Sequence, residues 1–131
     1  MISSWVISPE DAKILLDYRK RGIVSRFDFY VGEIFKNGYR NSLDILKEIV
    51  EPCGGRIARF RNHAKVTVCI GEKYDAVIEC LANLNVNPRC EQCCITIDSE
   101  LANFYIDFFN EIIDFDGRYK NWKPYKKKDK K

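Results

Sequence analysis

The sequence predicts a folded α/β domain, because helical and strand spacings of apolar residues alternate along its 131 residues. Over residues 43–53, apolar side chains recur every three or four positions, which places them on one face of a helix. Residues 56–61 alternate charged and apolar side chains, as a half-buried strand does. Residues 65–70 are β-branched and almost continuously apolar, which is typical of a strand covered on both faces.

Two glycines between this helix and the first of these strands predict a structural corner. Pro52 cannot continue the helical hydrogen bonds, and Gly54 can adopt the left-handed conformation in which many helices end. Gly55 would then let the backbone turn directly into the strand. The prediction is therefore a helix, a glycine corner, a strand, a turn and a second strand.

Before this core, the sequence predicts a helix, a strand and a loop. Ser8 and Pro9 are a typical helix start, and Gly22 follows a basic last turn, so we expect an N-terminal accessory or linker helix within residues 1–24. A first strand should begin at Ser25 and end at Gly32. Residues 35–40 should form a loop that leads to the helix at 42–52.

After the core, we expect a second helix over residues 73–84, a strand over 94–97 and a long last helix over 100–113, capped by Asp98 or Ser99. Apolar residues cover more than half of the last helix's circumference. Its aromatic residues exceed what one core-facing stripe needs and predict a surface that binds a protein partner: Phe104, Tyr105, Phe108 and Phe109.

The central stretch resembles a BRCT domain, a family in which an Ile/Val-rich helix runs into Gly-Gly and then two strands. The matching residues are Ile49-Val50, Gly54-Gly55 and the segment 66–71, VTVCIG, and the resemblance covers roughly two-thirds of the chain. It implies a four-stranded parallel sheet flanked by three helices over residues 25–117. The N-terminal helix and a basic C-terminal tail, 118–131, would be additions. A Trp near the start of the family's last helix has no counterpart here.

This resemblance implies a non-enzymatic scaffold for protein–protein interaction in DNA repair, the DNA damage response or replication, in the nucleus or otherwise the cytoplasm. Phosphopeptide-binding members carry a Ser or Thr before the glycine that ends the first strand, where this chain has Val31. Lys73 is the candidate for the family's phosphate-binding Lys. The chain therefore resembles the second member of a tandem pair, or a single domain with an accessory helix, and phosphopeptide binding would need a companion domain.

Charge is unevenly distributed and suggests an alternative function. Residues 118–131 carry eight Lys or Arg against one Asp, a net charge of +7, so residues 1–117, with 14 against 18, carry −4. The tail could bind DNA, act as a nuclear localisation signal or only increase solubility. The alternative prediction is a nucleic-acid-binding domain that uses Arg56, Arg59, Arg61, Lys123, Lys126, Lys127 and Lys128.

The cysteines suggest a third alternative, a small zinc-binding domain. Cys90 and Cys93 have the C-x-x-C spacing of half a zinc site, and Cys94 follows directly. The second half is hard to find, because His63 is the single histidine and the other cysteines lie within helix or strand patterns. Cys80 could join the three to give a four-Cys site with irregular spacing. We therefore expect reduced, partly buried thiols, no metal and no other cofactor.

Catalysis and membrane insertion are not expected. One histidine flanked by Arg61 and Lys65 lacks the orienting group that an activated nucleophile needs, and no phosphate-binding loop is present, so the prediction is no enzyme activity. No run of about 18 apolar residues indicates a membrane-spanning helix.

Overall fold

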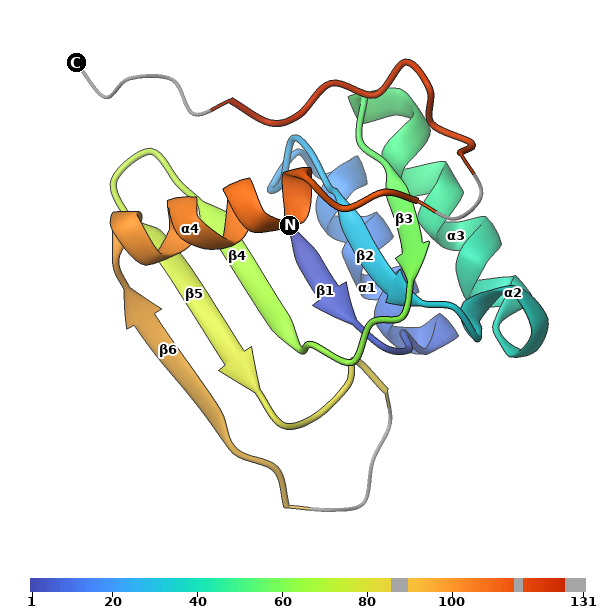
Figure 1. Cartoon of the computed structure of the whole chain (residues 1–131), viewed down its shortest axis with the longest axis horizontal. Coiled ribbons are helices and arrows are strands. Elements are labelled where there is room, and N and C mark those ends of the chain that lie inside the picture. Colours follow the sequence, from blue (N-terminus) through green and yellow to red (C-terminus); the bar gives the residue numbers. More distant parts are fainter. Residues whose placement is uncertain (86–89, 115–116, 127–131) are drawn as a thin grey trace.

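The computed structural model describes residues 1–85, 90–114 and 117–126 and contains a six-stranded mixed sheet with helices on both faces (Figure 1). The strand order across the sheet is β3-β2-β1-β4-β5-β6. The strands are β1 (Ile2–Ser4), β2 (Phe29–Gly32), β3 (Ile57–Phe60), β4 (Val66–Ile70), β5 (Asp75–Cys80) and β6 (Cys93–Ile97).

One half of the sheet is parallel and the other is antiparallel. β1, β2 and β3 run parallel, whereas β4 pairs antiparallel with β1, and β5 and β6 add further antiparallel neighbours. The predicted four-stranded parallel sheet flanked by three helices is therefore wrong. Residues 71–74 between β4 and β5 are too few for the crossover that two parallel strands require, so these strands form a hairpin.

The helices divide between the two faces of the sheet. α1 (Pro9–Lys20) and α3 (Arg40–Val50), with the short α2 (Phe35–Gly38) and a 3-10 turn over Glu51–Cys53, lie behind the parallel half in Figure 1. α4 (Ser99–Asn110) crosses the front of the sheet and packs on β4 and β5. No helix in the described ranges is long and apolar enough to cross a membrane.

The predicted helices at the N-terminus, before the glycine corner and after Asp98 are confirmed. Ser8 caps α1 by accepting a hydrogen bond from the Asp11 amide at 3.1 Å. Asp98 caps α4 through the amides of Glu100 and Leu101, at 2.7 and 3.0 Å. Gly54 ends the 3-10 turn in the left-handed conformation with φ of 69°, so the corner is also confirmed.

The predicted helix over residues 73–84 is wrong, because most of this segment is strand β5. Its residues pair in continuous register with β4 on one side and β6 on the other, from Asp75 to Cys80. Val77 is fully buried in the middle of the strand. The sequence pattern does not predict β1, and the strand predicted from Ser25 begins only at Phe29.

The core lies in two layers on opposite sides of the sheet. Behind the sheet, α1 and α3 bury apolar residues against β1, β2 and β3, including Phe29, Val31 and Leu46. In front, α4 buries Ile106 and Phe109 against the other faces of the same sheet. Both faces of β3 are therefore covered, in contrast to the half-buried strand that the sequence alternation predicts.

The described part of the predicted tail packs against the body. The indole nitrogen of Trp122 donates a hydrogen bond to Asp28 Oδ1 at 2.8 Å, and its ring lies 3.7 Å from the Arg56 guanidinium carbon. Tyr119 and Tyr125 pack against the two core layers. Residues 117–126 thus contribute to the fold.

Candidate functional site

The candidate site lies at the edge of the sheet where the parallel strands have their carboxyl ends. β3 and β4 follow one another in the chain, but β2 and β1 lie between them in the sheet. The connection, residues 61–65, must therefore cross the carboxyl ends of β2 and β1. In open α/β sheets, ligands commonly bind beyond the carboxyl ends of the parallel strands.

Buried hydrogen bonds hold the connection in place. The side-chain Nδ2 of Asn62 donates to Ser3 Oγ at 2.9 Å and to the Tyr30 carbonyl at 2.8 Å. Asn62 Oδ1 accepts from the Ala64 backbone amide at 3.0 Å. Ser3 Oγ donates to the Ala64 carbonyl at 2.9 Å. Since these groups are buried or partly buried, they fix the backbone from which the His63 side chain emerges.

His63, Lys65 and Trp5 form the centre of the site. Lys65 Nζ lies 3.0 Å from His63 Nδ1 and also donates to the His63 carbonyl at 3.0 Å. An ammonium group donates and cannot accept, so Nδ1 accepts and the proton of a neutral His63 lies on Nε2. The His63 ring centroid is 5.3 Å from that of Trp5, with the ring planes tilted by 44°.

Backbone hydrogen bonds hold Trp5 in place, and Gly32 leaves room for its indole ring. Its amide donates to Asn83 Oδ1 at 3.1 Å, and its carbonyl accepts from the Gly32 amide at 3.1 Å. A Cβ at Gly32 would lie 2.1 Å from Trp5 Cδ1, so the absence of a side chain at Gly32 admits the indole. Trp5 as a residue nevertheless stays 36% exposed, so it can reach a ligand.

Arg61 adds a second cation to the site. Its side chain is 85% exposed, and its Nε lies 3.7 Å from a carboxylate oxygen of Glu33, a weak surface pair. Arg61, Lys65 and the His63 ring thus lie on the connection over residues 61–65, and the Trp5 ring lies directly after the end of β1. This arrangement can attract an anion and stack a planar group beside it.

Two of the three predicted strand arginines are buried and do not reach this site. Arg56 is 7% exposed, donates to the Phe109 carbonyl at 3.0 Å and is covered by Trp122. Arg59 is also buried. The predicted half-buried strand, with its charged side chains in solvent, is wrong for both residues because both faces of β3 are covered, and over Arg56 the cover includes Trp122.

The other predicted phosphate and nucleic-acid residues lie away from the site or outside the described residues. Lys73 is exposed in the turn between β4 and β5, at the opposite edge of the sheet, and Val31 is fully buried. Lys123 and Lys126 are exposed. Lys127 and Lys128 lie outside the described residues.

The four aromatic residues predicted to bind a partner differ in exposure. Phe104 and Phe108, one turn apart on α4, are 61% and 53% exposed, whereas Phe109 is buried. Tyr105 is half-buried, and its hydrogen bond to Glu79 raises the pKa of Tyr105 to about 12. The surface part of the predicted patch is therefore Phe104 and Phe108.

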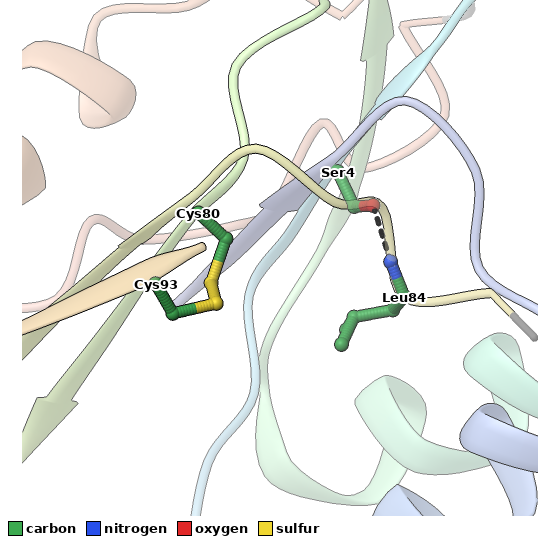
Figure 2. The surroundings of a disulfide bond; sticks show 4 residues. All are labelled: Ser4, Cys80, Leu84 and Cys93. Carbon is green, nitrogen blue, oxygen red and sulfur yellow. Dashed lines mark hydrogen bonds between the residues drawn. A yellow bond between two sulfur atoms is a disulfide. The ribbon is translucent and has the colours of Figure 1, made fainter. Parts of the chain in front are cut away.

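The cysteines differ from the expected set of reduced thiols. Cys80 and Cys93 form a disulfide between β5 and β6 (Figure 2). Cys90 and Cys94 are free and exposed. Of the three proposed zinc ligands, Cys93 is thus already bonded to sulfur. Within the described ranges, no three His, Cys, Asp or Glu side chains cluster as metal ligands.

The sequence pattern indicates His63 and Lys65 only separately and does not identify Trp5, Gly32 or Asn83. The closeness of His63 to Lys65 in sequence is the one available signal, since the other residues join them only through the sheet topology. Comparisons of the chain with protein-family models, curated proteins and solved structures found no match.

Proposed function

We propose that the protein binds single-stranded nucleic acid at the carboxyl edge of its parallel strands. Arg61 and Lys65 hold backbone phosphates, and the exposed edge of Trp5 beside His63 stacks against a base. The observation that carries this proposal is the contact of Lys65 with His63 next to the partly exposed Trp5 ring.

The chemistry of the site favours this ligand over other anions. Lys65 supplies an ammonium group, and a neutral His63 supplies an Nε2–H donor, both suited to phosphate oxygens. An aromatic ring beside such donors adds stacking, which contributes about 1–3 kcal/mol per base in single-strand-binding proteins. Stacking on Trp5 requires a base that is not already stacked within a duplex, so the expected ligand is a single strand.

The charge distribution predicts a short footprint. The body carries a net charge of −4, so attraction comes from local cations rather than from an extended basic surface. With two phosphates contacted, the logarithm of the binding constant should fall with the logarithm of salt concentration with a slope of about −1.4.

Fluorescence anisotropy with a labelled thymidine oligonucleotide tests the proposal on the full chain. Lys65→Ala should weaken binding about fivefold or more and reduce the salt slope by about 0.7, because it removes one phosphate contact. Lys73→Ala is the matched control, since this exposed lysine lies at the opposite edge of the sheet and should leave affinity unchanged.

Three results would contradict the proposal: no binding at low salt, equal loss in the two lysine variants, or full affinity in Lys65→Ala. Binding that disappears only when the C-terminal lysines are substituted would place the interface in the tail. Lys123→Ala and Lys126→Ala, both at exposed positions, test that outcome without removing Trp122.

The exposed pair Phe104 and Phe108 supports a second function, the binding of a protein partner through α4. Exposed substitutions usually change stability by less than about 0.5 kcal/mol, so Phe104→Ser with Phe108→Ser should leave the fold intact. We expect this double variant to lose a partner that wild-type protein retains in an affinity purification. Ile95→Ser on β6 is the control, because Ile95 is similarly exposed but pairs with Ile78 and so lies on the face of the sheet opposite to Val77 and α4. Identical sets of retained proteins would refute this function.

A further inference from the structure

We infer that the Cys80–Cys93 disulfide is a reversible redox site, opened by dithiol reductants, and that it controls the nucleic-acid site proposed above. The effect on nucleic-acid binding rests on that proposed function, whereas the redox site depends only on the pairing of β5 with β6.

The disulfide closes the end of the β5–β6 ladder that faces the candidate site. Cys80 and Cys93 are directly paired across the two strands, with their Cα atoms 4.2 Å apart. The next backbone contact is a hydrogen bond of 3.1 Å from the Leu81 amide to the Gln92 carbonyl. The covalent bond therefore fixes the point where the chain leaves β5.

The chain that leaves β5 runs directly to the strand that carries Trp5. The Leu84 amide donates to Ser4 Oγ at 3.1 Å, close to the disulfide (Figure 2), and Asn83 Oδ1 accepts from the Trp5 amide. The Leu84 carbonyl accepts from the Ser8 amide at 2.7 Å. Residues 81–84 therefore link the disulfide to the backbone on both sides of Trp5.

The disulfide can be reached by a reductant. Cys93 is exposed and lies on the edge strand β6. Cys80 is half-buried and lies on the neighbouring strand β5. Exposed disulfides are more easily exchanged than buried structural ones. Cys90 and Cys94, which flank Cys93 in the sequence, are free and exposed.

The chemistry is a two-electron thiol–disulfide exchange. A thiolate of the dithiol attacks Cys93 Sγ, forms a mixed disulfide and releases Cys80 as a thiolate, which takes a proton from water. The second thiol of the reductant, as its thiolate, then attacks the reductant's own sulfur in the mixed disulfide. A disulfide forms within the reductant, and Cys93 is released as a thiolate that takes a proton from water. The reductant loses two electrons and the protein gains them.

Opening the bond removes the covalent anchor at the start of residues 81–84. Asn83 is then held through its neighbour Leu84, which bonds to Ser4 Oγ and to the Ser8 amide, but without the covalent anchor at Cys80. The side chain that accepts from the Trp5 amide is therefore less firmly fixed. We expect the reduced protein to bind the thymidine oligonucleotide about tenfold more weakly, the loss that follows when one base stack is disordered.

Thiol counting and oligonucleotide binding on the full chain test both parts. Four thiols should react with a maleimide before treatment with dithiothreitol under native conditions and six afterwards. Affinity should fall on reduction and recover on reoxidation. Cys80→Ser with Cys93→Ser should fix the low affinity and remove its redox dependence, while Cys90→Ser with Cys94→Ser should keep the response.

Each contrary result has a separate meaning. Six reactive thiols before reduction, or four after it, would overturn the redox site. A bond that opens without a change in affinity would overturn its control of the edge. If neither form binds the oligonucleotide, the proposed function fails, and the emission of Trp5 in a Trp122→Phe background becomes the readout. If the Trp5 emission then did not change on reduction, the proposed link between the Cys80–Cys93 disulfide and Trp5 would also be wrong.

Discussion

Gly55→Val is expected to cost several kcal/mol of unfolding free energy, more than any of the other proposed substitutions. A Cβ at Gly55 would lie 1.7 Å from the Phe27 carbonyl oxygen and 2.9 Å from its carbon. Both contacts are with backbone, which cannot move aside as a flexible side chain can. The clash would push apart the segments that lead into β2 and β3, which are joined by a hydrogen bond of 2.8 Å from the Phe29 amide to the Arg56 carbonyl.

Chemical denaturation of the variant and the wild type measures this cost. Gly38→Ala is the control, because a Cβ at Gly38 meets nothing within 4 Å, and it should change stability by less than about 0.5 kcal/mol. A loss below about 1 kcal/mol in Gly55→Val would mean that the two segments are not as close as described.

Trp122→Ala is expected to have the second largest effect, a loss of about 3 kcal/mol. The indole covers the Arg56 guanidinium at 3.7 Å and donates to Asp28 at 2.8 Å. Removing it exposes a charge that is otherwise buried and takes a donor from the carboxylate that also accepts from the Arg56 amide at 3.1 Å. A residue of the predicted basic tail would thus contribute as much as a core residue.

Thermal or urea unfolding checks this value, and two variants separate its causes. Trp122→Phe retains a ring over Arg56 but not the hydrogen bond to Asp28, so it should lose less than Trp122→Ala. Lys123→Ala, at the exposed neighbouring position, should be nearly neutral. A neutral Trp122→Ala would show that residues 117–126 do not pack on the body in solution.

The elements that the sequence predicts correctly are those decided by neighbouring residues. The start of α1 follows from Ser8 and Pro9, and the start of α4 follows from Asp98, because a cap acts within one helical turn. The glycine corner likewise depends on the two residues that form it. These signals are local, so they survive any arrangement of the rest of the chain.

β5 could not be recognised locally because its apolar residues fit either period. Ala76, Val77 and Cys80 match a helical stripe, but the segment pairs with strands on both sides, and that pairing outweighs the local pattern. Asp75 also has a tertiary role: although fully buried, it accepts a hydrogen bond of 2.6 Å from Ser99 Oγ at the start of α4. Neither partner is visible from residues 73–84 alone.

The candidate site could not be predicted because the sheet topology assembles it. β1 has three residues, too few for a pattern, yet it separates β2 from β4 and so forces residues 61–65 across the strand ends. Trp5, Gly32, His63 and Asn83 meet only through that order. Arg56 shows the reverse error, since its charge suggests solvent although the fold buries it.

Nucleic acid is expected to bind beside His63, and because this is the single histidine of the chain, its binding can be measured directly. One imidazole Cε1–H signal should appear in a proton–carbon NMR correlation spectrum of the full protein. We expect this signal, together with the Trp5 indole signal, to shift saturably as a thymidine oligonucleotide is added, with the same midpoint as the anisotropy titration. Binding that saturates while the His63 signal stays in place would contradict the claim.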